Sequence, residues 1–532
     1  MRGADLLIKT LAEAGVTRIF SLSGNQIMPV YDACIDAGIE IVHTRHEAAA
    51  LYMAEAHAQL TGEVAVAMVT AGAGMANAMG PLFTALESDT PVLLLTGDSP
   101  VAQDGMGAFQ EMPQTAMAGP LAKLSIRPLR AADMGRDTAR ALRLAQSGRP
   151  GPVHMALAFD VVEGDAGEGA VPQKSAFARE PMPAGAGDLA ALRAALAGAA
   201  RPVVLAGPVL TATRFDALAA LAGALDAPVV PMESPRGLKD PALGAIGQLF
   251  ASADLVVSLG KKVDFTLGFG STRLFDAAAR WHVVQASAEE RDRAHRNLGD
   301  RLAQCVAADP RDVARQLLDT GAGSARAAWR DEAAKLLAAR STAEVPEGRI
   351  SPAALCAAVQ RQIDAAPEAV LICDGGEFGQ WSQACVQAPA RVINGVSGAI
   401  GGGLCYGIAA RYARPGATVF SLMGDGTAGF HFAEFETAAR QGIPMVVVIG
   451  NDLRWNAEHQ IQLRNYGPQR TIGCELSAAR YDLAAAAMGG HGEFVTDPGE
   501  LDAALARAVQ SGKPACVNVM IEGLPAPAGP AH

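Results

Sequence analysis

The clearest pattern along the chain is an alternation of short apolar runs with helix-like stretches. The runs are rich in β-branched residues and lack polar alternation; examples are "VAVAMVT" (64–70), "PVLLLTGD" (91–98), "AVLICDGG" (369–376), "ATVFSLMGDG" (417–426) and "PMVVVIGND" (444–452). Strands of this kind are typical of parallel sheets that helices cover on both faces. The pattern therefore predicts an α/β protein built from doubly wound parallel sheets.

Two stretches without periodicity divide the chain. Residues 163–188 are rich in Gly, Pro and Ala, and residues 319–352 are polar and partly helical. A chain of 532 residues is too long for one core, because domains usually hold about 100–200 residues. We therefore expect three domains of this class, at 1–165, 182–330 and 348–532.

The first and third blocks contain a near-repeat. Residues 68–98 and 422–452 each read as a strand, a Gly-rich turn, a helix, an X-Pro step and a second apolar strand. This layout favours a shared topology for the two blocks. The alternative, that any two βαβ units look alike, stays open at this point.

Charge and cysteine content narrow the choice of partners and compartment. The formal charge is −11 with no long basic block, which makes nucleic acid and anionic membranes poor partners. Residues 1–16 form an amphipathic pattern without the features of a signal peptide, and no segment has the apolar length of a membrane helix. The eight cysteines are scattered without a C-x-x-C motif, so we expect reduced thiols and a cytoplasmic protein.

Two acidic turns carry the most specific chemistry. Asp425 lies between Gly424 and Gly426 at the end of one apolar run, and Asp452 ends the next run. The carboxyl ends of neighbouring parallel strands meet at one edge of a sheet, where ligands bind. Two carboxylates beside a helix N-terminus suit a Mg²⁺ ion that binds phosphate oxygens. The alternative is a pair of ordinary turns with solvated carboxylates.

The "GDG…ND" pattern resembles the thiamine diphosphate motif of the superfamily that includes acetolactate synthase, pyruvate oxidase, benzaldehyde lyase and benzoylformate decarboxylase. The resemblance covers nearly the whole chain, in the order pyrimidine-binding, central and diphosphate-binding domain. It implies thiamine diphosphate and Mg²⁺ as cofactors, with Asp425, Asp452 and the backbone carbonyl of Arg454 as metal ligands. The family usually has Asn where Asp452 stands; the extra negative charge should strengthen the metal bond but repel diphosphate.

The resemblance implies further cofactor contacts. "VHTRHEAAALYMAEAHAQLTG" (42–62) resembles the segment whose glutamate, here Glu47, activates the cofactor by a hydrogen bond to its aminopyrimidine ring. "NGVSGAIGGG" (394–403) resembles the loop that bends the cofactor, with Ile400 between its two rings and the Gly398 carbonyl on its amino group. The residues expected at the diphosphate are Gly376, Glu377, Gly424, Gly426 and Thr427.

The expected substrate pocket also comes from the resemblance. "SGNQIMPVYDAC" and "GAFQEMPQ" resemble acetolactate synthases, and Thr70 stands where benzoylformate decarboxylases have a catalytic His. Simple decarboxylation to an aldehyde is therefore less favoured, and Gln110 is expected to donate to a substrate oxygen. The other pocket residues are Asn25, Gln26, Thr70, Phe109 and Trp455, with Lys123 at the rim. Each of these polar residues has a purely structural role as its alternative.

The expected reaction makes or breaks a C–C bond next to a carbonyl. It is either decarboxylation of a 2-oxo acid with carboligation, as in acetolactate synthases, or cleavage of a 2-hydroxy ketone. Ile461 replaces the Trp that selects the second 2-oxo acid in acetolactate synthases. In this family the glutamate and the diphosphate site come from different subunits, which implies a homodimer at least and favours a homotetramer.

Three alternatives stay open: an acyl-CoA lyase, a flavin-linked 2-oxo acid oxidase, and a non-catalytic regulatory subunit that keeps the fold. FAD is not expected, because "GKKVDF" (260–265) and "VVQAS" (283–287) lack the nucleotide-binding pattern of flavin-containing relatives. Lys261 and Lys262 leave an anion site in the central domain open.

Overall fold

The computed structural model describes residues 1–527 except for residues 235, 320–324, 340–348 and 395. Residues 320–324 and 340–348 of the expected linker at 319–352 lie outside the described residues. The chain forms two compact units, one of residues 1–179, 345–382 and 386–525 and one centred on residues 180–344. The exact domain boundaries stay a prediction.

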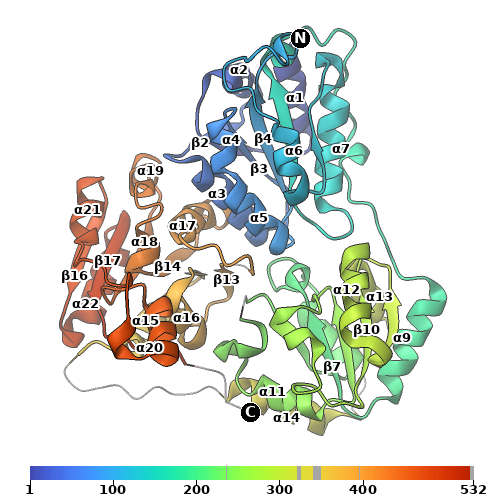
Figure 1. The fold of residues 1–532 in the computed structure, drawn as a ribbon, viewed down its shortest axis with the longest axis vertical. Coiled ribbons are helices and arrows are strands. Elements are labelled where there is room, and N and C mark those ends of the chain that lie inside the picture. The colour runs from blue at the N-terminus through green and yellow to red at the C-terminus, as the bar shows by residue number, and fades with distance from the viewer. Residues whose placement is uncertain (235, 320–324, 340–348, 395, 528–532) are drawn as a thin grey trace. The chain divides into compact units, whose positions relative to one another are not determined.

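The N-terminal sheet has six parallel strands in the order β2-β1-β3-β4-β6-β5. Figure 1 labels β2, β3 and β4 of this sheet. Its strands are β1 (Arg18–Ser21), β2 (Glu40–His43), β3 (Ala65–Val69), β4 (Val92–Asp98), β5 (Ser125–Ile126) and β6 (Val153–Ala158). Its helices are α1 (Gly3–Glu13), α2 (Met28–Ala37), α3 (Glu47–Thr61), α4 (Ala73–Asn77), α5 (Met79–Glu87), α6 (Gln114–Ala118), α7 (Met134–Gln146) and α8 (Phe159–Glu163).

The central sheet has five strands in the order β11-β10-β9-β7-β8. Its strands are β7 (Pro202–Ala206), β8 (Val229–Pro231), β9 (Leu255–Leu259), β10 (Arg280–Val284) and β11 (Leu302–Val306). Its helices are α9 (Ala186–Gly198), α10 (Leu218–Leu225), α11 (Ile246–Ser252), α12 (Ala288–Leu298), α13 (Pro310–Leu318) and α14 (Ala327–Ala338). Lys261 and Lys262 follow β9 and are buried; an anion site there stays a prediction.

The C-terminal sheet has six parallel strands in the order β13-β12-β14-β15-β17-β16. Its strands are β12 (Ala369–Cys373), β13 (Ala390–Ile393), β14 (Thr418–Gly424), β15 (Met445–Asn451), β16 (His491–Val495) and β17 (Pro514–Met520). Its helices are α15 (Pro352–Ala365), α16 (Gly376–Cys385), α17 (Gly403–Ala413), α18 (Asp425–Ala428), α19 (Glu434–Arg440), α20 (Asn456–Tyr466), α21 (Tyr481–Ala487) and α22 (Leu501–Gln510).

The first and third sheets have the same topology. Numbered from the first strand of each, both run 2-1-3-4-6-5. The central strands β3, β4 and β15 are buried along their whole length, as expected for parallel strands covered on both faces. The α/β class and the shared topology that the near-repeat predicted are both confirmed.

One helix differs from expectation. The sequence pattern after Gly426 reads as a single helix that buries Phe432, Phe435 and Ala439, but the structure has two helices, α18 and α19. Between them Phe430 packs so closely on Gly401 that a Cβ added to this glycine would overlap the Phe430 side chain. Only Phe435 of the three expected residues is fully buried.

Within the first unit, α3 and α17 pack together in one apolar core. The rings of Tyr52 and Tyr406 meet edge to face at 5.6 Å. The Tyr406 hydroxyl donates to the buried carboxylate of Glu55 at 2.9 Å. A hydrogen-bonded carboxylate in this core avoids the cost of an unpaired buried charge, so the contact joins the N- and C-terminal domains of the chain.

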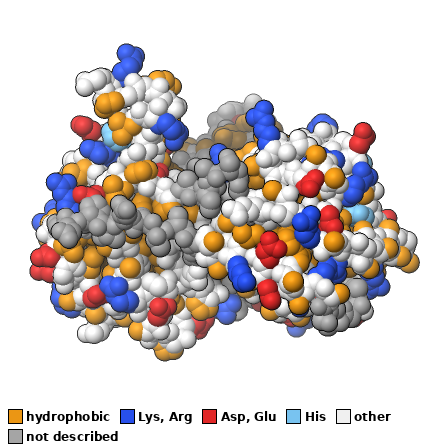
Figure 2. Space-filling model, turned by 90° about the horizontal axis from the view of Figure 1, so that it is seen from below, with side chains coloured by type: hydrophobic (Ala, Val, Ile, Leu, Met, Phe, Trp, Pro, Cys, Tyr) orange, Lys and Arg blue, Asp and Glu red, His pale blue; other side chains and the backbone are white. Residues whose placement is uncertain are grey.

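The surface shown in Figure 2 carries basic and acidic side chains interspersed among apolar ones. No helix in the described part of the chain is long and apolar enough to cross a membrane.

Candidate active site

Asp425 and Asp452 lie at the carboxyl ends of two adjacent strands. β14 and β15 pair in parallel with Gly424 opposite Gly450, so the residues that follow them meet at one edge of the sheet. Burial raises the pKa of Asp425 to about 6. Burial and the nearby Asp425 carboxylate raise the pKa of Asp452 to about 7. The arrangement therefore holds two carboxylates close together in a poorly hydrated place, as the sequence predicted.

This pair fits a divalent cation. The Oδ2 atom of Asp425 is buried and, among the described residues, accepts no hydrogen bond. Such an oxygen is costly unless a ligand satisfies it. The described residues contain no cluster of three or more His, Cys, Asp or Glu side chains that could hold a metal, so further ligands would be backbone oxygens, neutral side-chain oxygens, water or a cofactor. Mg²⁺ prefers such a set, because it takes oxygen ligands and retains water.

A tight turn carries the next residues. Leu453 has a left-handed φ of 61°, and its backbone N–H donates to the side-chain oxygen of the buried Asn451 at 3.3 Å. The Trp455 backbone N–H donates to the Cys474 carbonyl at 2.8 Å. These bonds fix the backbone on both sides of Arg454. A cavity of about 530 Å³ opens here, lined in part by Asp452 and Arg454.

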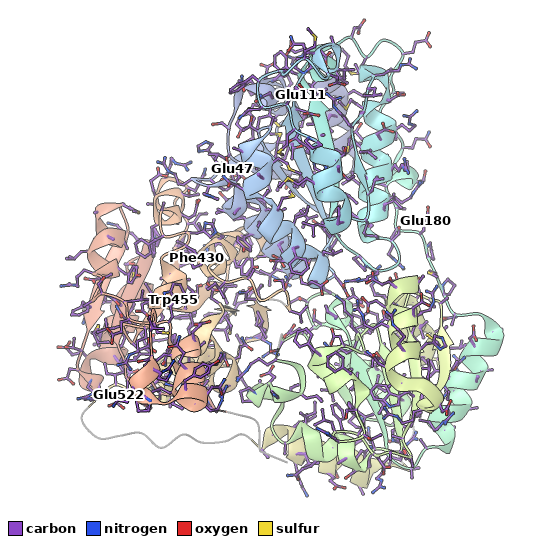
Figure 3. The ribbon with its side chains drawn as sticks, in the orientation of Figure 1. Glu47, Glu111, Glu180, Phe430, Trp455 and Glu522 are labelled. Atoms are coloured by element: carbon purple, nitrogen blue, oxygen red, sulfur yellow. The ribbon has the colours of Figure 1, made fainter. Side chains whose placement is uncertain are left out.

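Trp455 and Phe430 form an aromatic wall beside the acidic pair. A Cβ atom on Gly426 would lie 2.6 Å from the Trp455 ring, so only glycine lets the ring approach this turn. Phe430 meets Trp455 edge to face at 6.2 Å, and both lie on the C-terminal domain (Figure 3). Phe430 is 53% exposed. Trp455 therefore lies against the turn that carries Asp425, and Phe430 is a neighbour that the motif did not indicate.

The expected diphosphate residues come together at the same edge. Gly376 has a left-handed φ of 77°, and a Cβ there would lie 3.5 Å from the Thr427 methyl group. A Cβ on Gly375 would overlap the Ile400 side chain. The turn before α16, the turn before α18 and the Ile400 loop are thus neighbours. Glu377 lies in the first turn of α16.

Sequence reasoning missed Asp374, which directly follows β12. Its side chain is completely buried and accepts hydrogen bonds from the backbone N–H groups of Gly375 at 2.6 Å, Gly401 at 3.0 Å and Gly403 at 3.0 Å. Burial raises the pKa of its carboxyl group. The signal was present, because an apolar strand followed by Asp and Gly is the same pattern that identified Asp425.

Glu47 is the first residue of α3, in the N-terminal domain (Figure 3). Its carboxylate accepts a hydrogen bond from the Asn77 side chain at 3.0 Å. His46 caps the helix, since its Nδ1 atom accepts from the Ala48 backbone N–H at 3.1 Å. Glu47 is only half-buried, so the carboxylate is held in place while it stays accessible to a ligand.

A second missed residue, Glu434, holds the turn before Glu47. It is completely buried in α19 and accepts from the Arg45 backbone N–H at 2.9 Å and the Thr437 hydroxyl at 2.6 Å. Burial raises its pKa to about 7. An acidic residue directly before the buried Phe435 of an amphipathic helix was the available signal.

Three expected pocket residues form a hydrogen-bonded chain. The Thr70 hydroxyl donates to Gln26 at 2.6 Å, and Gln26 donates to the Gln110 side-chain oxygen at 2.7 Å. A Cβ added to Gly74 would lie 2.8 Å from the Thr70 methyl group and 3.4 Å from the Glu47 carboxylate. We call these three residues, Thr70, Gln26 and Gln110, the chain of amides; it lies beside Glu47.

The loop before α6 carries both Gln110 and Phe109, and their side chains point in different directions. Gln110 has a left-handed φ of 60°, and the carboxylate of Glu111 accepts from the Gly107 and Ala108 backbone N–H groups at 2.9 and 3.0 Å. These bonds shape the loop so that Gln110 points toward Gln26 while Phe109 is 71% exposed. Asn25 is also exposed, so the structure does not join it or Phe109 to the chain of amides.

Lys123 was expected at the rim of the pocket, and this placement is wrong. Its ammonium group donates to the Ser147 carbonyl at 2.6 Å, and its backbone N–H donates to the Pro152 carbonyl directly before β6. It therefore lies at the amino end of the sheet, whereas Glu47 and Thr70 lie at the carboxyl end. Lys123 stabilises the end of α7.

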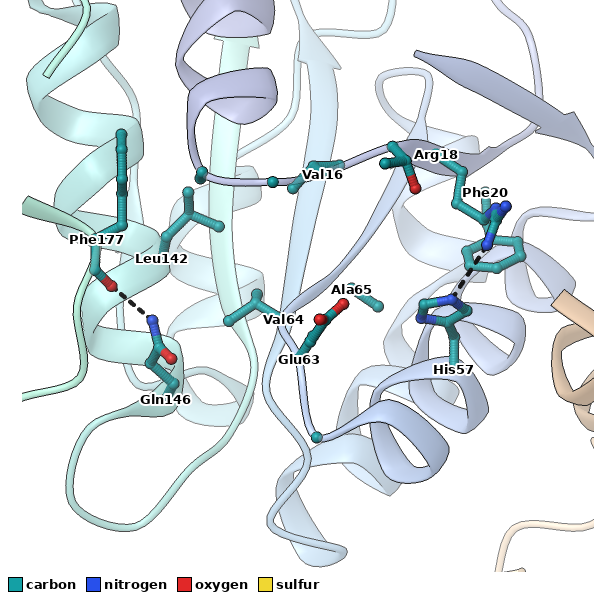
Figure 4. A pocket seen from close by; sticks show the side chains of 14 residues that line it. Val16, Arg18, Phe20, His57, Glu63, Val64, Ala65, Leu142, Gln146 and Phe177 are labelled. Atoms are coloured by element: carbon teal, nitrogen blue, oxygen red, sulfur yellow. Dashed lines mark hydrogen bonds between the residues drawn. The ribbon is translucent and has the colours of Figure 1, made fainter. Parts of the chain in front are cut away.

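A cavity of about 240 Å³ also opens at the amino end of this sheet (Figure 4). It is lined by Arg18 and Ala65, the first residues of β1 and β3. The Arg18 guanidinium lies 3.4 Å from the ring nitrogen of His57, and Gln146 donates to the Phe177 carbonyl at 2.6 Å. We do not assign this cavity to the active site, because it lies at the wrong end of the strands.

Comparison with known proteins agrees with this geometry. Residues 1–117 match the thiamine pyrophosphate enzyme N-terminal TPP binding domain, and residues 374–519 match the C-terminal TPP binding domain. Thiamine pyrophosphate is another name for thiamine diphosphate. The acetolactate synthase large subunit IlvG of Mycobacterium tuberculosis is 32% identical, with 98% of this chain and 96% of that protein covered.

A probable acetolactate synthase of Mycobacterium bovis has the same identity and coverage. The 2-hydroxyacyl-CoA lyase 2 of Homo sapiens is 28% identical, with 98% of this chain and 90% of that protein covered. The chain therefore belongs to the thiamine pyrophosphate enzyme family, in which both acetolactate synthases and 2-hydroxyacyl-CoA lyases are its relatives.

Proposed function

We propose that the protein is a thiamine diphosphate- and Mg²⁺-dependent enzyme that makes or breaks C–C bonds next to a carbonyl. The observation that carries the proposal is the pair Asp425 and Asp452 at adjacent strand ends, where one buried carboxylate oxygen accepts no hydrogen bond from the described residues. A divalent cation held here would satisfy this oxygen and offset the repulsion between the two carboxylates, and it would supply positive charge for diphosphate binding.

The metal would be held by Asp425, Asp452 and the backbone carbonyl of Arg454. The glycine turns around Gly376 and Gly426, with Thr427, would contact the diphosphate through backbone N–H groups. Bound thiamine diphosphate supplies a carbon nucleophile that adds to a carbonyl and an electron sink for the bond that breaks.

Glu47 would hold a proton at the aminopyrimidine ring of the cofactor. It suits this role because it is fixed by Asn77 and remains half-buried at the start of α3. A carboxyl group can give and take a proton at a ring nitrogen only within hydrogen-bond reach. The Gly398 carbonyl and the Ile400 side chain would orient the same ring.

The chain of amides would bind the substrate carbonyl. Gln110 accepts from Gln26 through its side-chain oxygen, which turns its amide N–H groups toward other acceptors. An N–H donor near a reacting carbonyl stabilises negative charge on the oxygen without losing a proton. Thr70 fixes Gln26 in the same way, so both amides have defined orientations. Phe109 and Asn25 would border this pocket, and Trp455 would border its metal end.

The favoured reaction is decarboxylation of a 2-oxo acid with carboligation, or the lyase reaction on a 2-hydroxy ketone. The acetolactate synthase relatives support the first form. An acyl-CoA lyase is the second candidate, because several relatives are named 2-hydroxyacyl-CoA lyase 2. A flavin-linked oxidase and a non-catalytic subunit remain the weaker alternatives. FAD is not part of the proposal.

We also propose a homodimer at least, and a homotetramer as the favoured form. Three exposed large apolar side chains support an assembly that covers them: Met106, Phe109 and Phe430 are 76%, 71% and 53% exposed. A cytoplasmic location is part of the same proposal. The buried thiols of Cys34 and Cys516 form no disulfide, which is consistent with a reducing compartment.

The test is a panel of 2-oxo acids, 2-hydroxy ketones and 2-hydroxyacyl-CoA thioesters, with products identified by mass spectrometry. Each substrate is assayed with thiamine diphosphate and Mg²⁺, and again after both are removed. We expect cofactor-dependent turnover of at least one 2-oxo acid or 2-hydroxy ketone, and Glu47→Gln should lower it by about 10²–10⁴-fold. Turnover of the thioesters alone would select the acyl-CoA lyase, and no cofactor-dependent turnover with any substrate would contradict the proposal.

A further inference from the structure

We propose that Asp374 is a positioning residue that fixes the wedge loop (residues 398–403) against the diphosphate turn (residues 375–377). The inference rests on the proposed function, because it concerns how two segments that would contact the cofactor are held together. Its basis is a single carboxylate that bonds to both segments.

The hydrogen bonds of Asp374 divide between its two oxygens. Oδ1 accepts from the backbone N–H groups of Gly375 at 2.6 Å and Gly401 at 3.0 Å, with the Asn394 amide 3.4 Å away. Oδ2 accepts from the backbone N–H of Gly403 at 3.0 Å. Gly375 belongs to the diphosphate turn, whereas Gly401 and Gly403 belong to the wedge loop, so one side chain joins the two.

The same contacts place Ile400. This residue directly precedes Gly401, whose N–H is bound by Asp374. A Cβ on Gly375 would overlap an Ile400 methyl group, so the side chain lies directly over the diphosphate turn. Phe430 packs closely against Gly401. Ile400 is thus held between backbone hydrogen bonds and packing, with little freedom to move.

The burial of Asp374 is difficult to explain by packing alone. The residue is completely shielded from solvent, and no cation lies among the donors described above. An unpaired charge in such a place costs several kcal/mol or more. A carboxylate that accepts several N–H bonds avoids much of this cost. The carboxylate is tolerated here because the wedge loop supplies N–H donors. The same hydrogen bonds fix the shape of the wedge loop.

Asp374→Asn is a selective test of this role. The amide oxygen can replace Oδ1 and keep the bonds from Gly375 and Gly401. The amide nitrogen then replaces Oδ2 and faces the Gly403 N–H, where two donors meet and the bond is lost. The diphosphate turn keeps its contact, while the wedge loop loses one.

The experiment compares two probes by calorimetry in the presence of Mg²⁺: thiamine diphosphate, which engages both segments, and inorganic pyrophosphate, which engages only the turn. For Asp374→Asn we expect the Kd of thiamine diphosphate to rise by about 10–100-fold, the size usual for loss of a supporting contact. The Kd of pyrophosphate should change by less than about threefold.

Two further variants separate positioning from general damage. Ile400→Ala removes the side chain that Asp374 would position, so Asp374→Asn should add less than about threefold in that background, since contacts that act through one another are not additive. Gly403→Ala keeps the carboxylate but places a methyl group 2.9 Å from its Oδ2 atom. It should reproduce the selective loss of thiamine diphosphate affinity if Asp374→Asn does not fold.

The matched control is Asp309→Asn in the central domain. Asp309 is also completely buried and accepts a backbone N–H, from Arg311 at 2.9 Å. This variant should lower the thermal midpoint and leave the Kd of both probes within about twofold. Equal loss of both probes in Asp374→Asn, or full additivity with Ile400→Ala, would overturn the inference. Absence of thiamine diphosphate binding in the wild-type protein would instead overturn the proposed function.

Discussion

The N- and C-terminal sheets have the same strand order but different chemistry at their carboxyl ends. After β3 the first sheet has Thr70, whose hydroxyl joins a chain of neutral amides. After β14, the corresponding strand, the third sheet has Asp425, and β15 ends before Asp452. The shared topology supplies the same edge twice, and the residues at the strand ends decide what that edge can bind.

Glu47 makes the contrast sharper. It begins α3, the helix between the second and third strands of the first sheet, and α17 occupies the same place in the third sheet. α17 begins instead at Gly403, the last residue of the wedge loop. Under the proposed function, one copy of the fold would contribute a proton-handling carboxylate where the other would contribute an apolar wedge, and single substitutions can test this division of roles.

The largest effect is expected from Glu47→Gln. General acid–base groups contribute about 10²–10⁴-fold to rate, and we expect kcat to fall by that factor. Thiamine diphosphate affinity should change little, because the diphosphate half is untouched. Single-turnover kinetics and calorimetry measure the two quantities separately. An unchanged kcat would remove Glu47 from the mechanism.

Asp425→Ala should weaken the binding of thiamine diphosphate through its diphosphate half. Removing one partner of a buried charged contact costs about 3–5 kcal/mol, which corresponds to at least a 100-fold weaker Mg²⁺-dependent binding of thiamine diphosphate. Equilibrium dialysis over a range of Mg²⁺ concentrations measures it. The matched control is the buried Asp482 of the same domain, whose conversion to Asn should leave the Mg²⁺ dependence in place. Mg²⁺-dependent binding that survives Asp425→Ala would exclude this carboxylate as a metal ligand.

Gln26→Leu should lower kcat/KM for the substrate without changing the affinity for the cofactor. It leaves Thr70 and Gln110 without their amide partner, and an unsatisfied buried polar group costs about 1–3 kcal/mol. We expect kcat/KM to fall by about 10–100-fold, with cofactor affinity unchanged. The control is Asp36→Asn at an exposed position of α2, which should stay within about twofold of wild type. Equal effects of the two changes would remove the chain of amides from the site.

Glu434→Gln should change how stability depends on pH. Burial raises the Glu434 pKa to about 7 from its ordinary 4.5, so the folded wild type loses stability as pH rises from about 4.5 through about 7. Gln keeps an oxygen for the Arg45 N–H and lacks this loss. The variant should therefore gain on the order of 2 kcal/mol relative to wild type between about pH 5 and pH 8.

Urea unfolding of the cofactor-free protein at both pH values measures this difference. Charged or titratable residues near Glu434 include Arg45, His46 and Cys405, and all three remain in the variant. A constant difference between the two proteins across this pH range would show that the buried carboxylate does not titrate there.

Asp452→Asn should have the smallest effect. Asn keeps an oxygen for the metal but removes one negative charge beside Asp425. We expect up to about tenfold weaker Mg²⁺ binding, with weaker repulsion of the diphosphate offsetting part of it. Magnesium titrations at fixed thiamine diphosphate measure the net result. Complete loss of binding would mean that the second charge is required in this chain.

The sequence predicted those site residues whose positions follow from the ends of parallel strands. Asp425 and Asp452 follow apolar runs, so their meeting at one edge follows from parallel topology alone. Gln26 and Thr70 were identified by resemblance, and the structure joins them by hydrogen bonds. Glu47 was likewise expected, and its helix begins at this residue.

Contacts between distant segments could not be predicted in this way. Asp374 bonds to Gly401 and Gly403, and Glu434 bonds to the backbone of Arg45. These bonds use backbone N–H groups, which every residue except proline carries, so a sequence does not show which residue accepts from which. Lys123 shows the opposite error, because a local match to a motif does not reveal which end of the sheet the residue occupies.

The most direct test of the account is a calorimetric titration of the wild-type protein with thiamine diphosphate, with Mg²⁺ present and after its removal by a chelator. The account predicts saturable binding of one cofactor per chain that requires Mg²⁺. Absence of binding, or binding that is equally tight without a divalent cation, would contradict the central claim that Asp425 and Asp452 hold a diphosphate through a metal ion.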